Sequence, residues 1–229
     1  MGRLARTIDD GLVFHAINRG NNRADVFGDD GDRIAFLEAL GKTKDRYPLR
    51  LFGYCVMTNH FHLLLRPEAG QSISRILQSL TVAHTWRYHK RHHSSGHVWQ
   101  GRFKSPVVQD DDHLLVVLRY IEANPLRAKM VADLADHRWS SFLHHGMGQD
   151  DPLLSPFPEW EQLGRTEAER RRRWRAKVRA VPSEAELTVV RSSLRSGRPF
   201  GAQDWTKRIA QRLKIDLTSR PRGRPRKAN

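Results

Sequence analysis

Two apolar runs separated by only two residues place the strongest constraint on how this chain can fold. Residues 49–57 and 60–66 both have the composition of β-strands, and only Thr58 and Asn59 lie between them. Because two residues cannot hold a crossover helix, the two runs are expected to pair as an antiparallel hairpin. The rest of the fold must therefore be built around this hairpin.

The segments around the hairpin alternate between strand and helix patterns. In chain order, the predicted elements are a strand (12–17), a helix (32–47), the two hairpin strands and a long helix from Ser72. An extended segment (97–109), interrupted by Gly101 and Pro106, and a helix from Asp112 follow. This order is the ferredoxin-like, split βαβ plan. We therefore expect an α+β fold, with a ferredoxin-like antiparallel sheet flanked by helices and a basic helical C-terminal extension.

The positive charge of the chain is concentrated in its last third. The whole sequence has a formal net charge of +15. Residues 1–163 hold 20 Lys and Arg against 19 Asp and Glu, whereas residues 164–229 hold 20 against 6. All 12 histidines lie between His15 and His145. A nearly neutral, histidine-rich body is thus followed by a cationic segment, which favours polyanions such as nucleic acid through phosphate contacts.

The composition argues against several other classes of protein. No run of about 18 consecutive apolar residues is present, so no transmembrane helix is expected. The first ten residues lack the apolar centre of a signal peptide. Cys55 is the single cysteine and has no partner for an internal disulfide. These features predict a cytoplasmic protein with no membrane partner.

His60 and His62 are the first candidates for chemistry. Side chains alternate between the two faces of a strand, so both imidazoles share one face, and Phe61, Leu63 and Leu65 lie on the other. Two neutral imidazoles that converge can hold a divalent metal ion if a third ligand arrives from elsewhere. A His-x-His pair is also common by chance. The metal interpretation therefore depends on what the rest of the chain supplies.

A second pair of candidates lies in the helix that follows Asp112. Tyr120 and Asn124 are four residues apart, so they share a helix face. The amide oxygen of Asn124 can serve as a third metal ligand, and the phenolic oxygen of Tyr120 can act as a nucleophile that forms a covalent intermediate. Taken singly, each residue is more often structural than functional. The combination with the two histidines is far more selective.

These residues stand in motifs that resemble those of the single-tyrosine HUH transposases. The motifs are Met57-Thr58-Asn59-His60-Phe61-His62-Leu63-Leu64, Tyr120-Ile121-Glu122-Ala123-Asn124-Pro125, Arg19-Gly20-Asn21 and Trp99-Gln100-Gly101-Arg102-Phe103-Lys104. The match is closer to the REP-associated tyrosine transposases, which often carry Asn followed by Pro at the position of Asn124. The resemblance covers roughly residues 8–145.

The resemblance implies a metal-dependent DNA nuclease and strand-transferase that acts on single-stranded, hairpin-containing DNA. His60, His62 and Asn124 would hold Mg²⁺ or Mn²⁺. Tyr120 would attack the scissile phosphate and give a 5′-phosphotyrosine link and a free 3′-OH. A monomer or homodimer, nucleoid-associated and of bacterial type, would fit this family. The alternative is a non-catalytic protein that recognises hairpin DNA with the same fold.

Further basic and aromatic residues are candidates for DNA binding. Arg19 is expected near the cleavage site. Arg102 and Lys104 are candidates to contact phosphate or to stack on a base beside Trp99 and Phe103. The alternative for this segment is a strand with a buried aromatic face. The histidines of the long helix are expected at the surface or on DNA: His84, His89, His92 and His93.

The last residues resemble an AT-hook. Residues 221–227 read Pro-Arg-Gly-Arg-Pro-Arg-Lys, in which Arg222 and Arg224 would enter the narrow minor groove of A·T-rich duplex DNA. A generic basic tail is the alternative. The expected organisation is a catalytic domain (1–145), a linker rich in Gly, Pro and Asp (146–163), a basic helical extension (164–218) and an AT-hook-like tail (219–229).

Overall fold

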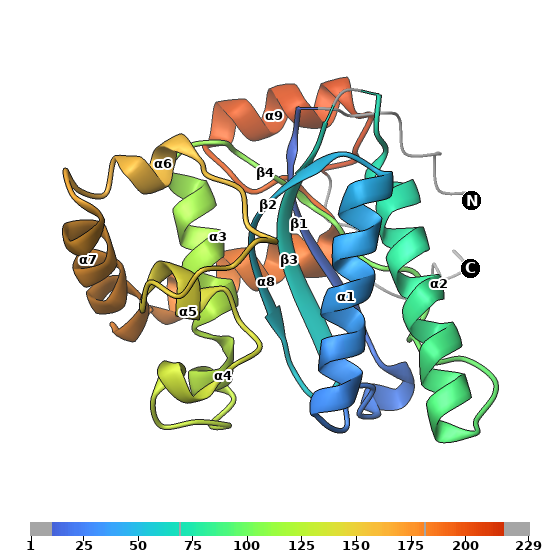
Figure 1. The fold of residues 1–229 in the computed structure, drawn as a ribbon. Coiled ribbons are helices and arrows are strands. Elements are labelled where there is room, and N and C mark those ends of the chain that lie inside the picture. The colour runs from blue at the N-terminus through green and yellow to red at the C-terminus, as the bar shows by residue number, and fades with distance from the viewer. Residues whose placement is uncertain (1–10, 69, 181, 218–229) are drawn as a thin grey trace, which may run out of the picture.

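A four-stranded antiparallel sheet lies at the centre of the protein (Figure 1). The computed structural model describes residues 11–68, 70–180 and 182–217. The strands are β1 (Val13–Arg19), β2 (Leu49–Val56), β3 (His60–Pro67) and β4 (Val107–Val108), in the spatial order β2-β3-β1-β4. This order results from two βαβ halves with a hairpin between them, so the expected α+β fold with a ferredoxin-like sheet is confirmed.

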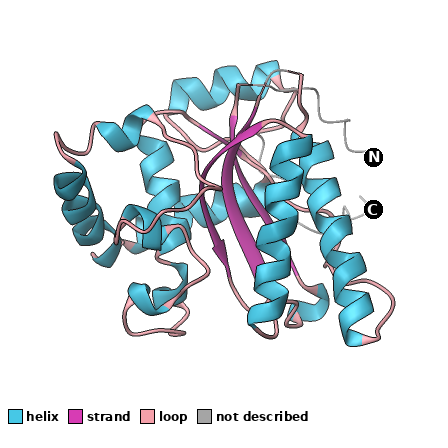
Figure 2. Ribbon diagram, in the orientation of Figure 1, coloured by secondary structure: helices cyan, strands magenta, loops and turns pink. Residues whose placement is uncertain are grey.

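Helices cover both faces of the sheet (Figure 2). Those in the described part of the chain are α1 (Asp30–Arg46), α2 (Ile73–His92), α3 (Asp112–Glu122), α4 (Asn124–Arg127), α5 (Phe142–His145), α6 (Pro158–Glu161), α7 (Glu167–Arg179), α8 (Glu184–Ser196) and α9 (Gln203–Arg212). The described part of the chain also has two short 3-10 helices, Asn21–Arg23 and Leu134–Asp136. No helix within these residues is long and apolar enough to cross a membrane.

Helices α1 and α2 lie side by side over one face of the sheet (Figure 1). Both begin at a side chain that caps the free backbone N–H groups: Asp29 accepts from Asp32 N, and Ser72 from Ser74 N. Beneath them, Phe61 of β3 packs with fully buried apolar side chains of both helices. This face is therefore the larger of the two apolar clusters of the core.

Helix α3 packs on the opposite face, against β2. Leu114, Leu118 and Ile121 are fully buried and recur at helical spacing, so one stripe of α3 faces the sheet. A Cβ at Gly53 would lie 2.2 Å from Leu118 Cδ1. The absence of a side chain at Gly53 therefore lets α3 approach β2 closely enough to fix the position of the residues at the end of the helix.

The extended segment predicted at residues 97–109 is mostly a loop. Only Val107 and Val108 form a strand beside β1, and isolated bridges join Trp99 to Gly20 and Lys104 to Ile17. Gly101 adopts a φ of +97°, and Pro106 has no N–H to donate, so both interrupt the ladder. The interruptions predicted at Gly101 and Pro106 are therefore present, and the segment follows the edge of the sheet with only a short strand at its end.

The C-terminal part of the described chain packs on the body of the fold. In the segment predicted to be a linker, Tyr54 Oη donates to Asp151 and Ser155 N donates to Leu51 O. Trp174 of α7 is completely buried in the core under α3. Phe200 exchanges backbone hydrogen bonds with Val107 and Gln109, so the chain after α8 lies along β4. The division into domains stays a prediction.

Candidate functional site

The strand register brings the two histidines to the face that α3 covers. In the β1–β3 pair, Arg19 lies opposite His60 and Ile17 opposite His62. The ring centroids of His60 and His62 are 5.0 Å apart, and both side chains line the same cavity. Phe61 points into the apolar core on the other face. The shared face predicted from the alternation of the strand is therefore present.

Tyr120 reaches the histidines from the last turn of α3. Its ring centroid lies 5.8 Å from that of His62 and 5.9 Å from that of His15, both in edge-on arrangements. Asn124 begins the next short helix, where Pro125 occupies the first turn. Although a change of helix separates them, Tyr120 and Asn124 line the same cavity as His60 and His62. Tertiary packing thus brings the four predicted side chains together.

The cavity has a volume of about 820 Å³ and is open to solvent. Five cationic side chains line it: Arg19, Arg23, Arg102, Lys104 and Arg195. Among the described residues, no Asp or Glu contributes to the lining. A cleft lined by one sign of charge concentrates ligands of the opposite sign. The cavity is therefore suited to an anion such as a nucleic-acid phosphate.

Hydrogen bonds to the histidine rings leave one nitrogen of each ring available. Asn59 Oδ1 lies 2.6 Å from His60 Nδ1, so this nitrogen donates and Nε2 keeps its lone pair. His62 Nδ1 lies 2.9 Å from His15 Nε2. In the tautomer in which His62 donates across this contact, its Nε2 is also free. Such partners are the usual way in which proteins orient ligating histidines.

Burial keeps these imidazoles neutral. It lowers the pKa of His60 to about 4, with a smaller contribution from the charge of Arg19. Burial lowers the pKa of His15 to about 3, and Arg127 adds to the effect. The pKa of His62 lies well below its usual value, first because of burial and then because of His60 and His15. At neutral pH all three rings are in the form that can bind a metal ion.

The donor set fits a divalent ion only if Asn124 takes part. Within the described ranges, no three His, Cys, Asp or Glu side chains gather in a way that could hold a metal. Asn124 Nδ2 is buried and has no hydrogen-bond partner, so the rest of the protein leaves this amide group only partly paired. Two neutral imidazoles and one amide leave the charge of a divalent ion uncompensated. An anionic phosphate can complete its coordination.

Arg127, which the sequence analysis did not identify, lies against Tyr120. Its guanidinium carbon is 4.2 Å from the centre of the Tyr120 ring, and Nη2 donates to Tyr120 O at 2.8 Å. Nη1 is buried without a hydrogen-bond partner, and burial lowers the pKa of Arg127. The one signal in the sequence is the spacing of seven residues, which is two helical turns. The stacking fixes the orientation of the phenol ring.

Glu122 is a second group that sequence reasoning missed. It is completely buried, and its oxygens lie 2.5 Å from Ser141 Oγ, 2.6 Å from His145 Nδ1 and 2.7 Å from Trp174 Nε1. These contacts join α3 to α5 and α7. No feature of the sequence indicates that residues so far apart share one carboxyl group.

The predicted DNA-binding residues divide into three groups. Arg19, Arg102 and Lys104 all line the cavity, and Arg19 also donates to Gln100 Oε1 through Nε and Nη2. Trp99 instead packs on Phe61 and donates from Nε1 to Thr81 O. The aromatic part of this segment is therefore structural, as the buried-face alternative predicts. Arg222 and Arg224 lie outside the described residues.

The prediction that His84 lies at the surface was wrong. His84 is 2 % exposed, and its ring packs against Phe27 and Trp99 while Nε2 lies 3.1 Å from Val26 O. The helical spacing from Leu77 and Leu80 places it on the buried stripe of α2. Nε2 is thus paired with a backbone carbonyl rather than with solvent, and Nδ1 is buried without a hydrogen-bond partner.

Comparison with known proteins identifies the family. The chain matches the family model described as "Transposase IS200 like" over residues 10–124, just over half of its 229 residues. The protein therefore belongs to the IS200-like transposase family. The matched region includes β1 to α3 and all four of Tyr120, Asn124, His60 and His62.

Two relatives point to one branch of this family. A curated Haemophilus influenzae protein, named as a REP-associated tyrosine transposase, is 29% identical over 118 residues, which are 47% of this chain and 66% of that protein. The match thus spans slightly less than two thirds of that relative. A solved structure described as a REP-associated tyrosine transposase bound to a REP hairpin shares the fold, with a TM-score of 0.54, 18% identity, and coverage of 69% of this chain and 99% of the other. The resemblance inferred from the motifs is confirmed.

Proposed function

We propose that this protein is a metal-dependent DNA endonuclease and strand-transferase in which Tyr120 is the nucleophile. The observation that carries the proposal is the convergence of Tyr120, His60, His62 and Asn124 on one cationic cavity. Its relatives are REP-associated tyrosine transposases, and one of them is described as bound to a REP hairpin. The proposed substrate is therefore single-stranded DNA that carries a hairpin.

In the proposed reaction, the phenolic oxygen of Tyr120 attacks the scissile phosphorus. A bond forms between Tyr120 Oη and phosphorus as the phenol gives up its proton to solvent. The bond from phosphorus to the 3′ oxygen breaks, and this oxygen takes up a proton from solvent and leaves as a hydroxyl. The 5′ side of the DNA remains linked to the protein as a phosphotyrosine. A free 3′-OH can later attack this link, which reverses the exchange and joins strands.

The roles of the surrounding residues follow from charge. His60, His62 and Asn124 would hold Mg²⁺ or Mn²⁺, which polarises the phosphate and neutralises the charge that develops during attack. The cationic side chains around the cavity draw the strand in through its phosphates. Arg127 keeps the phenol ring in one orientation. A non-catalytic hairpin-binding protein with the same fold remains the second candidate, because its cavity would be equally cationic.

The test is covalent capture of DNA. With a 5′-labelled and a 3′-labelled hairpin oligonucleotide, the unsubstituted chain should give an SDS-resistant adduct in Mg²⁺ or Mn²⁺ and none in EDTA. Tyr120→Phe should abolish the adduct, because the nucleophilic oxygen is lost, whereas Tyr47→Phe, distant from the cavity, should not. His60→Ala should remove the dependence on metal together with cleavage, and exposed His97→Ala is its control. An adduct that persists in Tyr120→Phe would overturn the assignment of the nucleophile.

A further inference from the structure

We propose that α8, in the C-terminal extension, is part of the DNA-binding cavity and that Arg195 contacts a phosphate of the bound strand. This inference rests on the proposed function, since it takes the cavity beside Tyr120 to be the DNA site. It extends that proposal to a segment beyond residues 10–124, which are the part of the chain that the family model matches.

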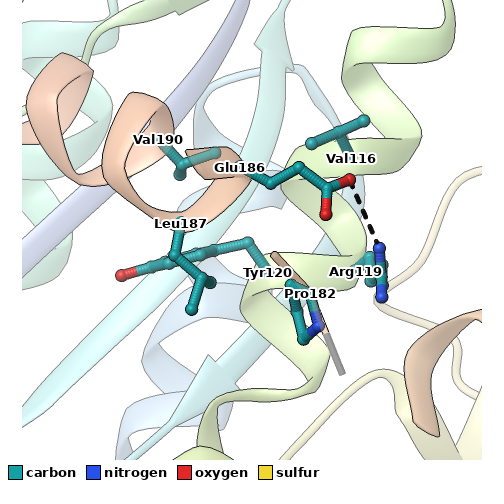
Figure 3. A pocket seen from close by; sticks show the side chains of 7 residues that line it. All are labelled: Val116, Arg119, Tyr120, Pro182, Glu186, Leu187 and Val190. Carbon is teal, nitrogen blue, oxygen red and sulfur yellow. Dashed lines mark ion pairs between the residues drawn. The ribbon is translucent and has the colours of Figure 1, made fainter. Parts of the chain in front are cut away.

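Helix α8 packs against α3, the helix that carries Tyr120. Ser183 and Glu186 form a reciprocal cap at its start, which satisfies free backbone donors there. Leu187 and Val190 are buried and, with Tyr120, line a small crevice between α8 and α3 (Figure 3). At the edge of this crevice, Arg119 of α3 forms an ion pair with Glu186 at 3.6 Å. One side of the Tyr120 ring is therefore covered by the extension.

The chain on either side of α8 is also attached to the body of the fold. Before it, Trp174 Nε1 donates to Glu122 Oε2 at 2.7 Å. After it, Gly197 adopts a φ of +76°, which turns the chain. Phe200 N then donates to Val107 O at 2.8 Å, and Gln109 N donates to Phe200 O at 2.8 Å. Because the chain is attached to the body of the fold on both sides of α8, the position of α8 beside the cavity is fixed.

This placement brings the last turn of α8 to the cavity. Leu194 is buried and Arg195 is exposed, and both line the space that His60 and Tyr120 also line. One turn earlier, Arg191 is paired with Glu184 at 3.6 Å. No ion pair of Arg195 occurs within the residues that the structure describes. Arg195 is thus a cation at the cavity wall that is available to a ligand.

The cations of the cavity come from separate segments of the fold. Arg19 belongs to β1, Arg23 to the turn after it, Arg102 and Lys104 to the loop before β4, and Arg195 to α8. Cations on several walls of a cavity can bind successive phosphates of one strand, as in other sites for single-stranded nucleic acid. Without α8, the cavity would lose the cation that this helix supplies. The extension therefore helps to hold the strand against the nucleophile.

The experiment measures DNA binding by the full chain carrying Tyr120→Phe, so that no cleavage interferes. Its ligand is a fluorescent hairpin oligonucleotide with a single-stranded flank, titrated at several salt concentrations. Adding Arg195→Ala should weaken binding roughly three- to tenfold at about 0.15 M salt. It should also reduce the slope of log K against log salt by about 0.7, the value for one phosphate contact to a single strand. Arg195→Lys should keep the slope, because the charge is retained.

Lys42→Ala is the matched control for the loss of one charge. Lys42 is exposed on α1, which covers the other face of the sheet, and it does not line the cavity. Arg195→Ala that binds with the affinity and salt slope of Lys42→Ala would overturn the inference and leave the nucleophile assignment intact. Conversely, binding by the unsubstituted chain without any covalent adduct would overturn that assignment and leave the Arg195 contact intact.

Discussion

Two buried polar clusters lie at the end of α3, and they differ in how completely their groups are paired. Glu122 has three hydrogen-bonding neighbours and no unsatisfied oxygen. Two residues earlier, Tyr120 lies among groups that are only partly satisfied: Asn124 Nδ2 and Arg127 Nη1 are both buried without a partner. Residues two apart on a helix point in directions about 200° apart, so one helix supplies both clusters.

The two clusters therefore differ in what their polar groups still lack. A buried polar group without a partner costs free energy, and a fold retains it only if something offsets that cost. The Glu122 cluster joins α3 to α5 and α7 and is complete by itself. The Tyr120 cluster opens on the cationic cavity, and its two unpaired groups, on Asn124 and Arg127, are N–H donors without an acceptor. The free energy of unfolding of variants in each cluster can test whether the two clusters differ in their contribution to stability.

The largest expected effect is on the Glu122 cluster. Glu122→Ala leaves buried groups of Ser141, His145 and Trp174 without their shared partner, and it should lower the free energy of unfolding by about 3–5 kcal/mol. Glu68→Ala, at an exposed turn, should change it by no more than about 0.5 kcal/mol. Urea unfolding at pH 7 measures both. Equal stability of the two variants would show that the Glu122 contacts do not hold the helices together.

Acid should destabilise the fold through buried histidines that belong to neither cluster. Burial lowers the pKa of His84 to about 4 and that of His137 to about 4, from an ordinary value near 6.5. The folded state thus favours the neutral rings, and the stability they provide is complete above pH 6.5 and is lost as the pH falls through 4. Each of the two histidines contributes up to roughly 3 kcal/mol to the free energy of unfolding.

The loss of stability in acid should come from buried histidines outside the proposed site, so a substitution in the site should not remove it. His60→Ala should still lose the stability that His84 and His137 contribute between pH 6.5 and 4, because both lie outside the cavity. Urea unfolding at pH 7, 5.5 and 4.5 supplies the measurement. A free energy of unfolding that stays constant over this range would contradict the neutral, buried state of these two rings.

The smallest expected effect on stability is at Arg127. Arg127→Met removes a buried charge that has no carboxylate hydrogen-bonded to it and keeps much of the packing on Tyr120. The free energy of unfolding should change by less than about 1 kcal/mol, because the lost hydrogen bond is offset by the lost cost of burying charge. Adduct formation should nevertheless slow, since the phenol ring loses its stacking partner. A loss of stability as large as that of Glu122→Ala would show that Arg127 is needed to hold the fold together.

Much of the fold follows from local patterns. The two-residue connection at Thr58 and Asn59 requires a hairpin, and the caps at Asp29 and Ser72 mark the starts of two helices. The interruptions expected at Gly101 and Pro106 leave only the two residues of β4 as a strand in the segment 97–109. Alternation and capping act over a few residues, so a sequence shows them directly.

The candidate site was predictable only in part. The alternation of β3 was enough to place His60 and His62 on one face, and the motif resemblance added Tyr120 and Asn124. The contribution of Arg127 was indicated only by its spacing of seven residues from Tyr120, and the contact itself depends on how the chain turns at Pro125. The same is true of His15, whose contact with His62 requires that β1 and β3 pair in one particular register.

The sequence by itself determined the strand alternation, the caps, the concentration of charge in the last third and the motifs that identify the family. Only the tertiary structure decided which polar groups are buried together. Glu122 is shared by three distant residues, and Arg195 arrives at a cavity whose other cations precede it by more than 90 positions. Contacts of this kind depend on packing between elements, which no local periodicity encodes.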